Sequence, residues 1–176
     1  MFHSGTTALI EAWNALPDAG RIPARAGFDP MAMGSRIPQL WAGERLDDGL
    51  IRLRLAGAWV ERLHGRPLGG VGWLTLWRPD SRPMVLAALT RTFREARPVV
   101  LTADSPLMAG PLEIALTPMR GPSGAANRIV GLYQPLNAAD REAESVGELS
   151  ARLSVAAGPS LRAPLSLAAV DGRRIA

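Results

Sequence analysis

The sequence predicts an α+β fold, in which helices pack on one face of an antiparallel sheet. Apolar and polar residues alternate in residues 51–55 and 112–117, the pattern of strands with one wet face. Residues 80–96 instead repeat apolar side chains at helical spacing, and three β-rich runs follow them. Strands, then a long helix, then a closing run of strands is the order expected of an antiparallel sheet with segregated helices.

The N-terminal segment predicts an amphipathic helix over residues 7–16, capped by Thr6 or Thr7 and ended by a proline. Its apolar stripe consists of Leu9, Ile10, Trp13 and Leu16. The proline- and glycine-rich residues 18–38 predict a surface loop with one helical turn starting near Asp29.

The next stretch predicts two strands, residues 39–43 and 51–55, joined by an Asp-Gly turn at 46–49. A short helix is expected after Gly57, on three apolar residues at helical spacing: Trp59, Val60 and Leu63. Residues 73–77 are apolar but too few to distinguish a strand from a buried helical turn.

The main helix is expected over residues 80–96, with Asp80 or Ser81 as its cap. Three strands follow, at residues 99–102, 112–119 and 128–136, the last two joined by a hairpin at 121–124. We expect an N-terminal flanking helix in residues 1–20, one domain in 21–136, and a partly flexible tail in 137–176. Within the tail we expect no regular structure over 138–163, and an optional edge strand at 165–170.

Composition excludes several kinds of chemistry. The absence of cysteine excludes disulfides, thiolate metal sites, iron–sulfur clusters and cysteine nucleophiles. All 20 basic residues are arginine, and they are scattered among 16 acidic residues with a net charge of +4, so no basic stripe of the nucleic-acid-binding kind is predicted. No apolar run approaches the roughly 20 residues of a membrane span, so we expect a cytoplasmic protein.

The order of these elements and three stretches of sequence resemble a stand-alone bacterial family of PAS domains. The likeness covers about residues 9–136. The stretches are IPAR (22–25) with FDP (28–30), IP (37–38), and RLAG (54–57) running to GRPLGG (65–70). The resemblance implies a five-stranded antiparallel sheet, a small pocket between the sheet and the helices, and a role in sensing or regulatory contacts.

Aromatic and apolar residues could line such a pocket for a flat or acyl ligand, although core filling is the other use of such side chains. The candidates are Trp59, Leu63, Trp73, Trp77, Leu89, Phe93 and Tyr133. The N-terminal helix offers Leu9, Ile10 and Trp13 either to a partner, as flanking helices do in PAS dimers, or to its own sheet.

No motif points to catalysis, so we expect no enzyme and no catalytic residue: no serine lies in a nucleophile elbow and no histidine pairs with an acid. Light-sensing PAS relatives that bond a chromophore covalently use a cysteine for that bond. This chain has no cysteine, which rules out a flavin–cysteinyl adduct. Haem relatives use a histidine near the long helix, which has none, so we expect neither haem nor another covalent cofactor. His64 could bind a metal, but without companion ligands we interpret it as a residue ending a short helix.

The leading hypothesis is therefore a stand-alone PAS-type sensory or regulatory domain that binds a small apolar or amphipathic ligand and signals through contacts with a protein partner. The alternative is a dimerising interaction adaptor whose pocket is filled by its own side chains, with no ligand. A weaker alternative is a nucleic-acid-associated protein. No membrane contact is expected.

Overall fold

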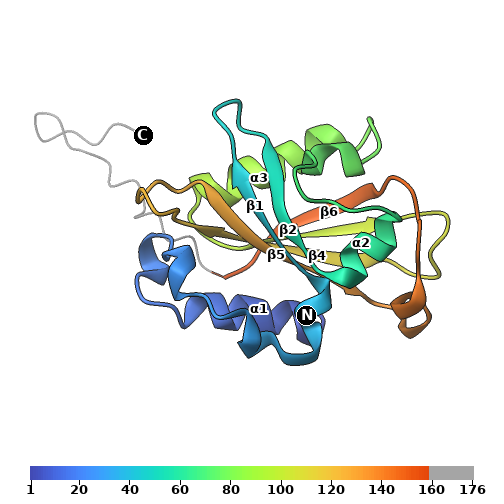
Figure 1. The fold of residues 1–176 in the computed structure, drawn as a ribbon, viewed down its shortest axis with the longest axis horizontal. Coiled ribbons are helices and arrows are strands. Elements are labelled where there is room, and N and C mark those ends of the chain that lie inside the picture. The colour runs from blue at the N-terminus through green and yellow to red at the C-terminus, as the bar shows by residue number, and fades with distance from the viewer. Residues whose placement is uncertain (159–176) are drawn as a thin grey trace, which may run out of the picture.

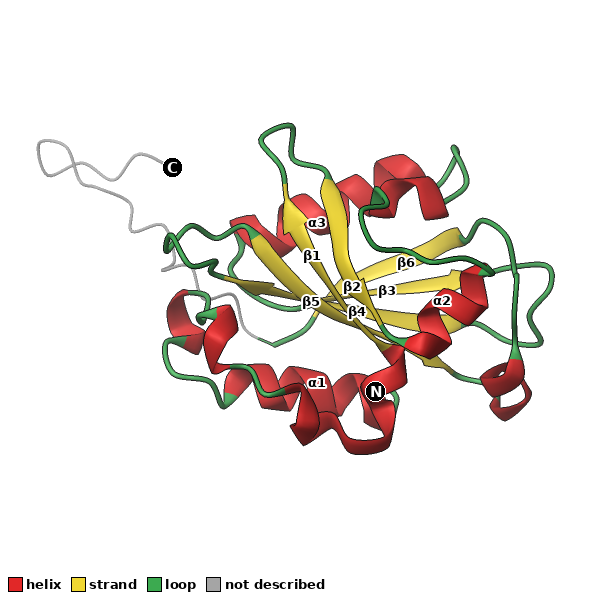
Figure 2. Cartoon of the chain, in the orientation of Figure 1, coloured by secondary structure: helices red, strands yellow, loops and turns green. Residues whose placement is uncertain are grey.

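The computed structural model describes residues 1–158 (Figures 1 and 2). A six-stranded antiparallel sheet with strand order β2-β1-β5-β4-β3-β6 forms its centre. The strands are β1 (Leu40–Arg45), β2 (Ile51–Ala56), β3 (Val99–Asp104), β4 (Leu112–Met119), β5 (Arg128–Pro135) and β6 (Ser150–Ala156). The α-helices of this range are α1 (Ser4–Asn14), α2 (Ala58–His64) and α3 (Arg82–Arg94). The predicted α+β class is confirmed, and β1 to β5 correspond to the five predicted strands.

Helices cover both faces of the sheet, which corrects the expectation of one covered face. Helices α2 and α3 pack on one face, and α1 packs against β4 and β5 on the other (Figure 1). Strand β4 is consequently buried at every position. Thr117, which the alternation pattern places on a wet face, is buried and donates a hydrogen bond to the Val130 carbonyl at 2.7 Å.

Helix α1 begins three residues earlier than predicted and uses a different cap. The imidazole Nδ1 of His3 accepts a hydrogen bond from the Gly5 amide at 3.2 Å, and so occupies the place predicted for a threonine. Thr6 lies inside the helix, with its hydroxyl buried and unpaired among the described residues. Farther along the chain, residues 73–77, which fitted either a strand or a buried helical turn, contain a short 3₁₀ segment, Trp73–Leu76.

The segment after β5 contains a 3₁₀ turn and a strand, so the prediction of no regular structure over 138–163 is wrong for residues 138–142 and 150–156. A 3₁₀ turn (Ala138–Glu142) leads to Val146 and Leu149, whose side chains are buried in the core under α2 and α3. Strand β6 then pairs with β3 at the edge of the sheet. The optional strand at 165–170 lies outside the described residues.

Within residues 1–158, no helix combines the length and the apolar character that a membrane crossing requires.

Candidate functional site

The predicted pocket residues meet on the α2 and α3 face of the sheet, where they form part of a closed aromatic core. Trp41, Trp73, Trp77 and Tyr133 are each at most 1% exposed. The rings of Trp41 and Trp73 stack with centroids 4.9 Å apart, and Trp77 meets Trp73 edge-on at 5.3 Å. The Trp73 indole donates a hydrogen bond to the Tyr133 hydroxyl at 2.9 Å. Protein side chains therefore occupy the space in which the resemblance placed a ligand.

Burial raises the pKa of the Tyr133 hydroxyl well above its ordinary value, and the hydrogen bond from Trp73 opposes that shift only in part. The phenol therefore stays neutral and remains an acceptor for the indole.

The other four predicted pocket residues surround this aromatic core. Leu63 and Leu89 are buried within it, and Phe93 is half-buried, with the Arg45 guanidinium 5.1 Å above its ring. Trp59 packs at the rim of the core, and its indole donates to the Arg141 carbonyl at 2.7 Å. Trp59 thus connects the predicted residues to a cavity that the sequence did not reveal.

The α1 residues proposed for a dimer contact face the protein's own sheet. Leu9 and Trp13 are at most 1% exposed, and the Trp13 indole donates to the Pro118 carbonyl at 2.8 Å. Ile10 is half-buried beside them. Of the two uses considered for this stripe, the structure shows packing onto the sheet for Leu9 and Trp13, which leaves neither side chain free for a partner.

His64 ends α2, as predicted, but its ring is largely enclosed. It meets the Tyr133 ring edge-on, with centroids 5.9 Å apart, and its Nε2 is buried without a hydrogen-bond partner in the described chain. Burial, and secondly the nearby Arg66, lower the pKa of His64 from 6.5 to about 4, against a hydrogen bond to the Gly147 backbone. The imidazole is therefore neutral at physiological pH. No group of three or more histidine and carboxylate side chains in residues 1–158 is arranged to hold a metal ion.

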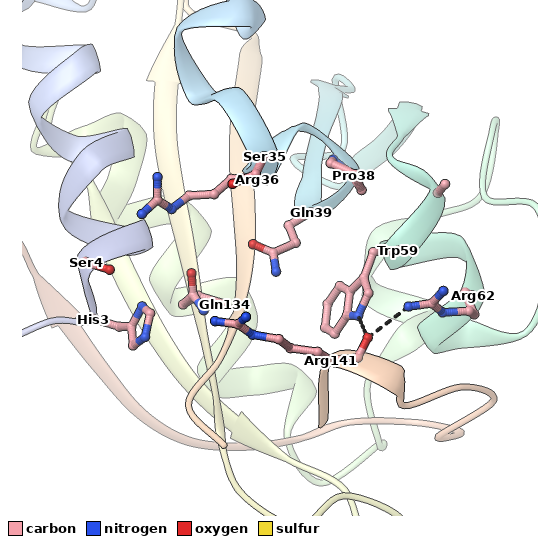
Figure 3. Close-up of a pocket in the computed structure, with 11 residues that line it drawn as sticks. His3, Ser4, Ser35, Arg36, Pro38, Gln39, Trp59, Arg62, Gln134 and Arg141 are labelled. Carbon is pink, nitrogen blue, oxygen red and sulfur yellow. Dashed lines mark hydrogen bonds between the residues drawn. The ribbon is translucent and has the colours of Figure 1, made fainter. Parts of the chain in front are cut away.

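The candidate site is a surface cavity of about 500 Å³ at one end of the sheet. Five parts of the chain form it: the start of α1, the second half of the 3₁₀ segment Pro30–Gln39, helix α2, the end of β5, and the 3₁₀ turn after β5 (Figure 3). The residues lining it are His3, Ser4, Ser35, Arg36, Pro38, Gln39, Ala58, Trp59, Arg62, Gln134 and Arg141. Except for Trp59, none of these was a predicted site residue.

Two glycines allow the walls of this cavity to approach one another. A Cβ on Gly57 would meet the Pro38 carbonyl group, so only glycine lets the end of β2 pass this close to the 3₁₀ segment. A Cβ on Gly5 would overlap the Gln134 side-chain oxygen and lie 3.1 Å from Arg36 Nε. Both side chains therefore lie directly against the first turn of α1.

The cavity is positively charged and contains no carboxylate in its lining. Arg36, Arg62 and Arg141 contribute guanidinium groups. Arg62 donates to the Arg141 carbonyl at 2.8 Å and lies 3.9 Å from the exposed Glu142 carboxylate. Within residues 1–158, the guanidinium groups of Arg36 and Arg141 have no hydrogen-bond or ion-pair partner. Two cations thus remain available to a ligand.

Two amides add polar groups to the same space. Gln134 is only 3% exposed, and its Nε2 donates to the Pro135 carbonyl at 2.9 Å. The side-chain oxygen of Gln39 is buried and accepts no hydrogen bond from the described residues. Figure 3 shows both amides directed into the space that Arg36 and Arg141 border. Such groups can recognise both an anion and a hydrogen-bond donor.

A family model described as a PAS domain matches residues 1–134. The chain belongs to this family. The PAS domain described here also resembles a solved structure titled an RNA-binding light-oxygen-voltage receptor, with a TM-score of 0.42 and 16% sequence identity. That match covers 77% of this chain and 50% of the receptor chain, so this chain spans half the receptor's length. No curated protein matches the chain.

Proposed function

We propose that this PAS domain is a regulatory module that acts by contacting protein chains, with its interior filled by its own side chains. The observation that carries the proposal is the aromatic core, in which Trp41, Trp73, Trp77 and Tyr133 are fully buried and in mutual contact. A small-molecule sensor of the same architecture needs a cavity there. The self-filled adaptor, the second of the sequence-based hypotheses, therefore agrees better with this packing than an interior ligand does.

The edge strand β6 supports a contact surface. It is the last strand of the sheet beside β3, and an edge strand presents backbone groups that another chain can pair with. Leu153 and Val155 are 55% and 38% exposed, and both lie on the α1 face of the sheet opposite Thr102 and Val100. At the opposite edge, β2 is partly covered, because Leu53 exchanges backbone hydrogen bonds with residues 70–71.

The proposed partners are a second copy of this chain and a regulatory protein. Sedimentation velocity over a range of concentrations tests the first of these. We expect a dimer at tens of micromolar that Leu153→Asp weakens and Leu55→Asp does not, because Leu55 is equally apolar and 62% exposed but lies on β2, at the opposite edge of the sheet. A monomer at every concentration would remove the homodimer from the proposal.

Native mass spectrometry of the freshly purified protein tests the filled interior. The expected spectrum shows no retained apolar molecule in the wild type. Trp77→Ala should open a space inside the core that takes up added indole, as engineered apolar cavities bind aromatic molecules. Uptake of indole by the wild type with the same affinity would show that the interior is open and would favour the ligand-binding hypothesis.

A further inference from the structure

We propose that the cavity at the start of α1 binds a small organic oxyanion, a carboxylate or phosphate group attached to a flat apolar body. The inference does not depend on the function proposed above, because the stacked rings of the core and the residues of β6 do not line the cavity.

The charge of the lining selects an anion. Three guanidinium groups and no carboxylate border about 500 Å³ of surface space, although the chain as a whole carries 16 acidic residues. Surface arginines elsewhere in the described chain commonly pair with acids, as Arg54 and Arg128 do with Glu44. Arg62 has the Glu142 carboxylate 3.9 Å away, but Arg36 and Arg141 have no ion-pair partner within residues 1–158. A bound oxyanion supplies a counter-charge to these two groups and accepts paired N–H donors from a guanidinium.

The N-terminus of α1 also favours the binding of an anion. Ser4 begins this helix of 11 residues and lines the cavity, so the positive end of the helix dipole lies at the wall. The buried Gln134 amide lies against the same turn, and it uses one of its N–H groups on Pro135. Its second N–H remains available as a donor to an anion.

The opposite wall selects the rest of the ligand. Pro38, Ala58 and the rim of Trp59 provide apolar surface, and the hydrogen bond to the Arg141 carbonyl fixes the indole. The volume is within the range of small-molecule sites, so an organic anion should bind more tightly than inorganic phosphate.

Four probes separate these contributions: 1-naphthoate, 1-naphthyl phosphate, the neutral 1-naphthamide, and inorganic phosphate. We expect both naphthyl anions to bind at least about tenfold more tightly than the amide, since one charge-assisted hydrogen bond is worth about that factor. They should also bind at least about tenfold more tightly than inorganic phosphate, which lacks the apolar body that the wall can bury. Whichever of the two anions binds more tightly identifies the acid group that the cavity prefers. The indole N–H resonance of Trp59 in a two-dimensional ¹H–¹⁵N spectrum should shift on binding and reports the location.

Arg36→Gln and Arg141→Gln should each weaken the binding of both naphthyl anions by about tenfold. Arg94→Gln is the matched control, because it removes the same charge from the far end of α3 and should leave the affinity unchanged. Urea unfolding of each variant checks that the fold is retained. The proposal is overturned if naphthamide binds as well as the anions, if Arg36→Gln and Arg141→Gln both bind like the wild type, if the Trp59 resonance does not move, or if neither anion binds at millimolar concentration.

Discussion

The enclosed imidazole of His64 should make the stability of the domain depend on pH. Its pKa is lowered to about 4 in the folded chain, whereas an unfolded chain leaves it at 6.5. The unfolded state therefore binds a proton first as the pH falls, and protonation favours unfolding. One pKa unit corresponds to 1.36 kcal/mol, so the free energy of unfolding should decrease by about 3 kcal/mol between pH 6.5 and pH 4. The loss should level off below about pH 3, where the imidazole is protonated in both states.

Urea denaturation at a series of pH values measures the effect, and His64→Gln isolates it. Glutamine is neutral throughout the range and can still donate to the Gly147 carbonyl. The carboxylates are the same in both proteins, so their contribution cancels when the two free energies of unfolding are subtracted. Glu148 borders the same surface depression as His64 and Arg66 and is present in both proteins. The wild type should lose about 3 kcal/mol relative to the variant between pH 6.5 and pH 4.

An independent measurement is the ring C–H resonance of His64 followed by NMR over the same pH range. The reasoning is refuted if the His64 ring titrates near 6.5 in the folded protein, or if the wild type and His64→Gln lose stability in parallel across this range.

Two further substitutions test the core and the approach of the cavity walls, each by urea denaturation. Trp73→Ala should cost about 3–5 kcal/mol, because it leaves a large cavity and an unpaired Tyr133 hydroxyl; a loss below 1 kcal/mol would contradict the closed core. Gly57→Ala should cost about 1–3 kcal/mol, because its Cβ meets the backbone carbonyl of Pro38, whereas Gly69→Ala, where a Cβ has open space, should be close to neutral.

The strands were predictable because their signals are local. Alternation and turn residues located β1 to β5, and the helical stripe located α3 to within two residues. Which face of the sheet is covered is not a local property. The pattern Leu112, Ile114, Leu116 reads as one wet face and one dry face, yet α1 covers the second face, so Glu113 and Thr117 are buried as well. Tertiary packing decides which face is covered. A buried polar side chain with a hydrogen-bond partner cannot be distinguished from an exposed one in the pattern of apolar and polar residues.

The cavity could not be read from the sequence for a similar reason. Arg36, Arg62 and Arg141 are far apart along the chain, and scattered arginines give no charge run that marks a site. The aromatic residues gave a stronger signal, which correctly gathered Trp73, Trp77 and Tyr133. That signal does not distinguish a ligand pocket from a filled core, because the same apolar side chains serve both.

The segment between β5 and β6 shows how backbone groups alone can order a stretch without periodicity. A helix leaves its last carbonyls without partners, and α2 offers those of Arg62 and Leu63 to the amides of Ser145 and Val146, at 3.0 and 2.8 Å. The Leu149 amide bonds in the same way to the end of the 3₁₀ segment Trp73–Leu76. Neither contact requires a particular side chain, so the composition of this segment predicts a flexible tail. Yet this anchoring holds Arg141 beside Trp59 at one end of the segment and directs β6 onto β3 at the other. The wall of the anion cavity and the exposed sheet edge are therefore two ends of one tethered segment, and a change in how α2 holds it must act on both.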